Sequence, residues 1–135
     1  MNVRVIYTAG VWDLLHRGHQ NLLLASAQLG DRLVVGVVSD DGTARYKGFY
    51  PTESEETRLR RVRALPYVDA ALIQEGTDPS DILRIVRPDV MTHGSDWKRL
   101  REGHATLERL RIEWRLLPYT PGVSSSMLRE QRRTG

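Results

Sequence analysis

Short apolar runs alternate with amphipathic stretches along the whole chain. Residues 3–7 alternate in the manner of a β-strand, and residues 33–38 form an almost continuous apolar run. A run of this second kind is typical of a strand that is buried on both faces of a parallel sheet. Further short strands are predicted at residues 70–74, 89–93 and 111–117.

Helical patterns fill most of the segments between these strands. Gly30 is placed to end the first helix, and Asp78 with Pro79 supplies an N-cap and a first helical position for a later one. The predicted helices cover residues 20–29, 54–65, 79–86, part of 97–110, and 125–132. Residues 39–52 are polar and contain glycine, so they are predicted to form a loop.

This alternation of strand and helix predicts the α/β class. We expect a single Rossmann-like domain over residues 1–135, with a parallel sheet of about five strands and helices on both faces. In such sheets, ligands bind beyond the carboxyl ends of the strands. That edge is predicted to collect residues 10–19, 39–47, 94–97 and 120–126.

Composition narrows the function classes. The chain has no cysteine, which excludes disulfides and thiolate chemistry, and it has no apolar stretch long enough for a membrane span or a signal sequence. We therefore expect a cytoplasmic protein without a membrane partner. The net charge of +3 suits an anionic ligand, but the basic residues are spread along the chain, which argues against a nucleic-acid partner.

The segment at residues 8–19 (TAGVWDLLHRGH) carries the strongest chemical signal. It joins a strand to a helix and places His16 and His19 on either side of Gly18. Free backbone N–H groups and the positive end of a helix dipole attract phosphate there, and the two imidazoles add donors that can become cationic near neutral pH. The alternative is a purely structural role, in which the two histidines only cap the helix.

Several further segments extend this signal into a family resemblance. Residues 16–19 (HRGH) follow residues 10–13, and residues 29–35, 67–69, 94–97 and 122–126 continue the same order and spacing. Together they resemble the nucleotidylyltransferase superfamily, and most closely the glycerol-3-phosphate cytidylyltransferase family. The resemblance implies attack of a phosphomonoester on the α-phosphate of CTP with release of pyrophosphate. It also implies Mg²⁺ carried in with the nucleotide, and a homodimer. No protein-bound metal site is expected, because the two histidines lack carboxylates at the spacing of metal ligands.

The resemblance also implies a role for individual residues. The catalytic residues would be His16, His19 and Lys47. The nucleotide would contact Gly10, Val11, Trp12, Asp13, Gly18, Arg58, Gly94, Asp96, Gly122, Ser124, Ser125 and Ser126. The acceptor substrate would contact Asp40, Asp69 and Trp97, whereas His93 and His104 are expected to be structural or exposed.

Departures from the family pattern leave other functions open. Val11 and the pair Lys47–Gly48 resemble the heptose-phosphate adenylyltransferases, which favours an ATP-dependent enzyme for a sugar or flavin phosphate as the alternative. Pro66 and Tyr119 stand where the family has arginines. A further alternative is therefore a non-catalytic, nucleotide-binding regulatory protein.

Overall fold

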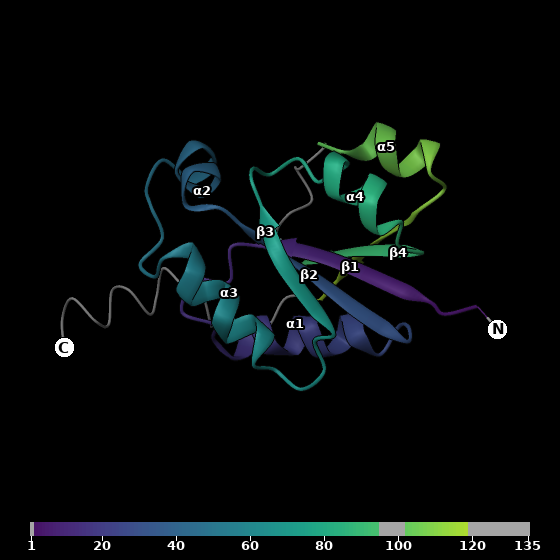
Figure 1. Cartoon of the computed structure of the whole chain (residues 1–135), viewed down its shortest axis with the longest axis horizontal. Helices are drawn as coiled ribbons and strands as arrows, with labels where there is room; N and C mark the ends of the chain where they lie inside the picture. The colour runs from purple at the N-terminus through teal and green to yellow at the C-terminus, as the bar shows by residue number, and fades with distance from the viewer. Residues whose placement is uncertain (1, 95–101, 119–135) are drawn as a thin grey trace.

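The computed structural model describes residues 2–94 and 102–118, which form one five-stranded parallel sheet. The strands are β1 (Val5–Gly10), β2 (Arg32–Val38), β3 (Ala70–Gln74), β4 (Val90–Gly94) and β5 (Glu113–Leu117). They are ordered β3-β2-β1-β4-β5 across the sheet, and every neighbouring pair is parallel (Figure 1). All five predicted strands are confirmed.

Helices cover both faces of this sheet. They are α1 (Arg17–Ala27), α2 (Asp40–Lys47), α3 (Glu55–Arg63), α4 (Ser80–Val86) and α5 (His104–Arg109). Leu23 of α1 and Val62 of α3 are buried in the core on one face, while Leu83 of α4 and Leu107 of α5 are buried on the other. Figure 1 shows α4 and α5 on the opposite side of the strands from α1. The predicted Rossmann-like α/β class is therefore confirmed.

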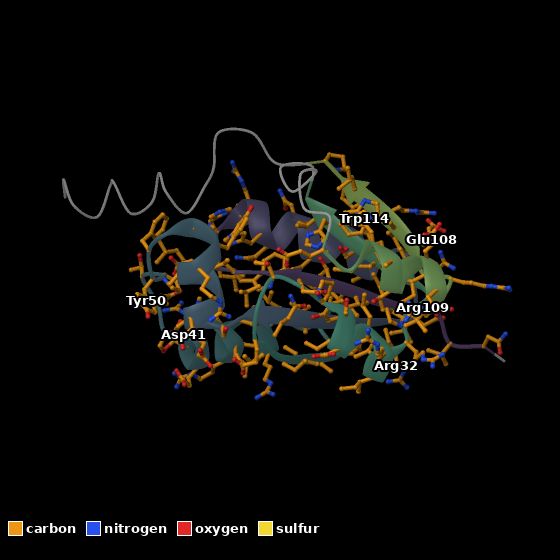
Figure 2. All side chains as sticks on the ribbon, turned by 90° about the horizontal axis from the view of Figure 1, so that it is seen from above. Arg32, Asp41, Tyr50, Glu108, Arg109 and Trp114 are labelled. Atoms are coloured by element: carbon orange, nitrogen blue, oxygen red, sulfur yellow. The ribbon has the colours of Figure 1, made fainter. Side chains whose placement is uncertain are left out.

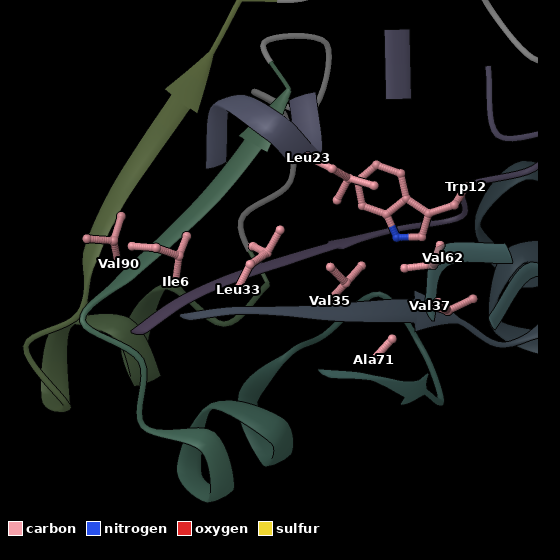
Figure 3. Close-up of a cluster of buried hydrophobic side chains, with 9 residues drawn as sticks. All are labelled: Ile6, Trp12, Leu23, Leu33, Val35, Val37, Val62, Ala71 and Val90. Carbon is pink, nitrogen blue, oxygen red and sulfur yellow. The ribbon is translucent and has the colours of Figure 1, made fainter. Parts of the chain in front are cut away.

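The core on the α1–α3 face is built from alternate positions of the central strands. Leu33, Val35 and Val37 of β2 point into it because successive side chains of a strand point to opposite faces. Trp12 lies among them (Figure 3). Gly36, between two of these valines, is required because a side chain there would collide with the buried hydroxyl of Tyr7 on the opposite face.

Aspartates join the strands at the amino edge of the sheet. Each precedes one strand and accepts a hydrogen bond from the backbone amide at the start of its neighbour. The bonds run from the amides of Arg4, Leu33 and Val5 to the carboxylates of Asp31, Asp69 and Asp89, at 2.8, 2.7 and 2.8 Å. These contacts satisfy donors that lie before the regular ladder of the sheet begins, and so fix the strand register.

The structure corrects one predicted element. Residues 40–47 form helix α2 where a loop was predicted. Ser39 caps this helix by accepting from the Gly42 amide at 3.0 Å, two aspartates stand in its first turn, and Gly48 ends it with a φ of 85°. Cap and dipole signals outweigh the poor helix propensity of Gly42.

Two helix boundaries also shift. The N-cap of α4 is Pro79 and not Asp78, whose carboxylate instead accepts from the amide and the hydroxyl of Ser80. Helix α1 begins at Arg17 and has its C-cap at Gln28, so Gly30 lies beyond the helix end. A Cβ at Gly30 would approach the Arg4 carbonyl oxygen to 2.7 Å, so close backbone approach explains this glycine. The helix predicted at residues 125–132 lies outside the described residues.

Candidate functional site

His16 and His19 cap helix α1 reciprocally. The His19 amide donates to Nδ1 of His16, and the His16 amide donates to Nδ1 of His19, both at 3.3 Å. The two rings stack with their centroids 3.6 Å apart. Because Nδ1 of each ring accepts a hydrogen bond, the neutral rings carry their proton on Nε2. Each imidazole therefore keeps an Nε2–H donor at the helix N-terminus.

Burial favours the neutral form of both imidazoles, whereas the sequence suggests donors that can become cationic near neutral pH. Burial lowers the pKa of His16, and burial together with the His16 and Lys47 charges lowers the pKa of His19 to about 3. Helix α1 also has no acidic residue in its first turn, whereas α2 and α3 each have two. An anion at this helix start thus meets dipoles and neutral donors, with no carboxylate in the first turn of the helix itself.

The loop before the histidines holds a strained backbone. Trp12 and Leu14 adopt φ values of 57° and 61°, in the left-handed region that non-glycine side chains rarely occupy. Each such residue costs on the order of 1–3 kcal/mol and persists only where surrounding contacts enforce it. Here the Trp12 Nε1 donates to the Gly36 carbonyl oxygen at 2.9 Å, and the Leu14 amide donates to Glu53 Oε1 at 3.0 Å.

Four loop residues expected at the nucleotide make contacts within the protein, and their expected nucleotide-binding roles stay predictions. The side chains of Val11, Trp12 and Asp13 are buried in the protein. The Asp13 carboxylate accepts hydrogen bonds from the amides of Thr52 and Glu53, at 2.8 and 3.0 Å. Gly10 is explained by the indole, since a Cβ there would lie 2.8 Å from the Trp12 ring. In the structure these residues shape the loop through their internal contacts.

Arg58, expected at a phosphate, acts in the structure as a buried clamp between several segments. Its side chain is 0% exposed and pairs with Asp40 at 2.6 Å. Its remaining hydrogen bonds go to the carbonyl oxygens of Glu53, Val11 and Val38, at 3.0, 2.8 and 2.8 Å. One guanidinium therefore joins the end of β2, the loop after β1 and the start of α2 and α3. Asp40, expected at the acceptor, is the partner of this clamp.

Lys47 lies at the last residue of α2, close enough for its charge to lower the pKa of His19. The sequence predicts this proximity correctly although it places the lysine in a loop. Helix α2 is held in turn by Arg58 through Asp40, and by the Asp40 amide, which donates to Glu55 Oε1 at 2.9 Å. The clamp therefore sets the position from which Lys47 faces the histidines.

Asp69 lies away from this site. It precedes β3 and binds the Leu33 amide at the amino edge, whereas the histidines follow β1 at the carboxyl edge. The expected acceptor contact of Asp69 is therefore corrected to a structural one. Gly18 and Gly94 are buried near the start of α1 and at the end of β4, both at the carboxyl edge as predicted.

Of the remaining predicted residues, His93 is described by the structure and six others are not. His93 is buried against Trp114, with the ring centroids 4.9 Å apart, and burial together with the His104 charge lowers the pKa of His93 to about 4. Its structural assignment is supported by this packing. The other predicted contacts lie outside the described residues: Asp96, Trp97, Gly122, Ser124, Ser125 and Ser126.

A family model described as cytidylyltransferase-like matches residues 7–131, which span the whole site described above. The chain belongs to the cytidylyltransferase-like family. A curated relative, "Bifunctional protein HldE" from Desulfatibacillum aliphaticivorans, is 35% identical over 134 residues, covering 98% of this chain and 27% of the relative. The protein of the same name from Streptomyces coelicolor is 40% identical over 129 residues, covering 92% of this chain and 27% of its own length.

This cytidylyltransferase-like chain spans about a quarter of the length of those two relatives. Among solved structures, the "lipopolysaccharide core biosynthesis protein" of Thermoplasma volcanium superposes with a TM-score of 0.72 at 32% identity, covering 88% of this chain and 98% of that one. Pantoate-beta-alanine ligase of Francisella tularensis reaches a TM-score of 0.66 at 13% identity, over 94% of this chain and 65% of that one, which is a likeness of fold.

Glu53 is the site residue that sequence reasoning missed. It accepts from the Leu14 amide and pairs with Arg61 at 2.9 Å, so it ties the strained loop of this cytidylyltransferase-like domain to α3. Its position just before the Ser54 N-cap gave a helix-start signal but no sign of its partner. Among the described residues, no three histidine or acidic side chains group as a metal site, and no helix has the length and apolar character to cross a membrane.

Proposed function

We propose that this domain transfers a nucleotidyl group from a nucleoside triphosphate, with ATP the preferred one, to a sugar phosphate. The observation that carries the proposal is the reciprocal histidine cap, which places two neutral Nε2–H donors at a helix N-terminus next to Lys47. The choice of ATP and a sugar phosphate is supported by Val11 and Lys47–Gly48, which resemble the heptose-phosphate adenylyltransferases. Similarity to the HldE proteins and to the lipopolysaccharide core biosynthesis protein supports the same choice.

In this reaction an oxygen of the acceptor phosphate attacks the α-phosphorus of the triphosphate, and the bond from that phosphorus to pyrophosphate breaks. Charge develops on phosphate oxygens, so fixed donors and positioning supply most of the catalysis. The imidazole donors and the helix dipole would hold the triphosphate, and Lys47 would neutralise charge beside His19. Mg²⁺ would arrive with the triphosphate, held by its oxygens and by water.

The experiment measures pyrophosphate release by the purified chain with ATP or CTP, each combined with sugar phosphates or glycerol 3-phosphate. We expect kcat/KM for ATP with a heptose or hexose phosphate to exceed that of every CTP pair at least tenfold. His19→Ala should lower kcat by on the order of 10²–10³, the usual effect of removing one such donor. His104→Ala, a histidine outside the cap, serves as the matched control and should stay within about twofold of the wild type.

The other outcomes select the alternatives. A preference for CTP with glycerol 3-phosphate would favour the second candidate, a cytidylyltransferase, which the sequence Gly94-Ser-Asp-Trp97 favours. Nucleotide binding with a turnover no higher than that of His16→Ala would favour a non-catalytic regulatory protein. Absence of both binding and turnover would refute nucleotidyl transfer by this chain.

A further inference from the structure

The loop between β1 and α1 and the segment before α3 each supply one carboxylate to the other. The Asp13 carboxylate accepts from the amides of Thr52 and Glu53, and the Glu53 carboxylate accepts from the amide of Leu14 at 3.0 Å. Asp13 is 1% exposed and the Glu53 side chain is 10% exposed, so water competes little for these bonds. We call this reciprocal contact between residues 13–14 and 52–53 the clasp.

Leu14 is the member of the clasp whose backbone is unfavourable on its own. Its φ of 61° lies in the left-handed region, where the Cβ of an L-residue crowds the following carbonyl oxygen. Relaxation to an ordinary φ would turn the Leu14 amide away from Glu53 Oε1. The strain of one such residue and the cost of leaving one buried amide without an acceptor are similar in size. A single carboxylate oxygen can therefore hold this conformation.

The conformation of Leu14 sets the direction in which the chain enters α1. Only Leu15 separates it from His16, the N-cap of the helix, and Leu15 packs against the core and has little freedom to compensate. The rings of His16 and His19 are oriented in turn by the 3.3 Å bonds of the reciprocal cap. The direction of the two Nε2–H donors thus depends on Leu14.

We propose that Glu53 is a positioning residue for nucleotidyl transfer, which holds Leu14 in the left-handed conformation so that both Nε2–H donors face the triphosphate. The inference rests on the proposed function and deepens it. The other oxygen of Glu53 pairs with Arg61 at 2.9 Å, but the Arg61 side chain is 56% exposed, so this pair contributes little. The acceptor oxygen at the Leu14 amide carries the role, and a neutral acceptor in the same place would fill most of it.

Two substitutions of Glu53 separate the hydrogen bond from the charge. Glu53→Gln keeps an oxygen that can accept from the Leu14 amide, whereas Glu53→Ala removes it. We expect kcat of Glu53→Ala to fall about thirtyfold, because a displacement of about 1 Å can cost on the order of 10² in rate, and kcat of Glu53→Gln to stay within about threefold of the wild type. Glu56→Ala, an exposed acid on α3, is the matched control and should change kcat by less than about twofold.

The strained backbone provides a rescue experiment. Glycine adopts a positive φ without steric cost, so Leu14→Gly should keep the loop in place when Glu53 is absent. Adding Leu14→Gly to Glu53→Ala should raise kcat at least about fivefold above that of Glu53→Ala alone, whereas two unrelated structural losses would add. A role of Glu53 in stability alone does not predict this gain.

A spectroscopic measurement does not depend on turnover. Proton–nitrogen correlation spectra of histidine rings report which nitrogen carries the proton, and the wild type should show the Nε2–H tautomer at His16 and His19. Glu53→Ala should convert at least one ring to a mixture of tautomers, and Glu53→Gln should not. In the wild type, the Leu14 amide should also exchange with solvent at least about a hundredfold more slowly than in an unstructured chain, a result that does not require Glu53→Ala to fold.

The assignment of Glu53 would be overturned by unchanged kcat and tautomers in Glu53→Ala, by equal losses in Glu53→Ala and Glu53→Gln, by absence of the glycine rescue, or by free exchange of the Leu14 amide. If the chain lacks transferase activity but the tautomers respond as expected, the proposed function fails and the positioning by Glu53 stands. If the chain is an active transferase and neither kcat nor the tautomers respond, the positioning fails and the proposed function stands.

Discussion

The two edges of the parallel sheet use buried polar groups in different ways. At the amino edge, three aspartates each bind one backbone amide of a neighbouring strand. At the carboxyl edge, single side chains bind several backbone groups: Arg58 binds carbonyl oxygens of three separate segments, and Asp13 binds two consecutive amides. Figure 2 separates the two regions, with Asp41 and Tyr50 at one end of the molecule and Arg32 toward the other. The amino edge fixes strand register, and the carboxyl edge fixes the shape of a site.

The largest expected effect comes from Arg58, where stability and activity should fall together. Arg58→Met leaves three carbonyl oxygens and Asp40 without their donor, a loss of the kind that costs about 3–5 kcal/mol when a buried ion pair is broken. Urea unfolding measures that cost. Arg60→Met, an exposed arginine on the same helix, should change stability by less than about 0.5 kcal/mol.

For the fraction of Arg58→Met that folds, kcat should also fall, because Lys47 loses the anchor of α2. A variant with wild-type stability would contradict the clamp, and a variant that is destabilised but has unchanged kcat would confine Arg58 to a structural role.

A smaller effect, on stability alone, is expected at the amino edge. Asp69→Ala leaves the Leu33 amide without its acceptor and should cost about 1–3 kcal/mol by urea unfolding. Its kcat/KM should stay within about twofold of the wild type, since the residue lies at the other edge from the histidines. Asp81→Ala is the control, because this aspartate is on the exposed surface of α4. A selective loss of acceptor binding in Asp69→Ala would restore the role that the sequence resemblance implies.

The third effect is a pH dependence of stability that comes from two histidines near the carboxyl edge, His19 and His93. The pKa of His19 is lowered to about 3 and that of His93 to about 4, so in acid the unfolded chain takes up protons that the folded chain does not. Stability should therefore be fully retained above about pH 6.5 and fall as the pH drops toward 4. Each histidine contributes at most about 1.4 kcal/mol per pH unit.

The urea midpoint measured at several pH values between 7 and 4 checks this dependence. His19→Asn, whose side-chain oxygen can replace Nδ1 as a cap acceptor, should flatten it by the share of one histidine. An unchanged slope in His19→Asn would contradict the lowered pKa of His19.

The sequence predicts the architecture well because strand burial leaves a strong pattern. The apolar run at residues 33–38 is all of β2 except its first residue, and all five strands occur where the pattern predicts a strand. The sequence does not predict helix α2 because Gly42 and Thr43 have low helix propensity. Ser39, the two following aspartates and Gly48 are nevertheless ordinary start and stop signals of a helix. In this segment the capping residues determine the helix more strongly than the propensity of its interior residues does.

The site was predicted less completely, for a reason that depends on geometry. His16, His19 and Lys47 come together as expected because chain order already places them after the first and second strands. Periodicity does not reveal which arginine of α3 is buried, because burial depends on packing. Nor does it reveal that the buried one, Arg58, binds Asp40 and three backbone carbonyl oxygens. For Asp69 a signal existed, since a residue just before a parallel strand lies at the amino edge.

The reciprocal cap limits how the two histidines could be introduced into another protein. Nδ1 of each ring accepts a hydrogen bond at the start of the helix. Nε2 therefore keeps its proton and its position only while the helix begins at this residue. Copying the two histidines onto a different turn would bring the side chains without the constraint that fixes their tautomer. A design would therefore have to transfer the end of β1, the strained loop and the first turn of α1 together.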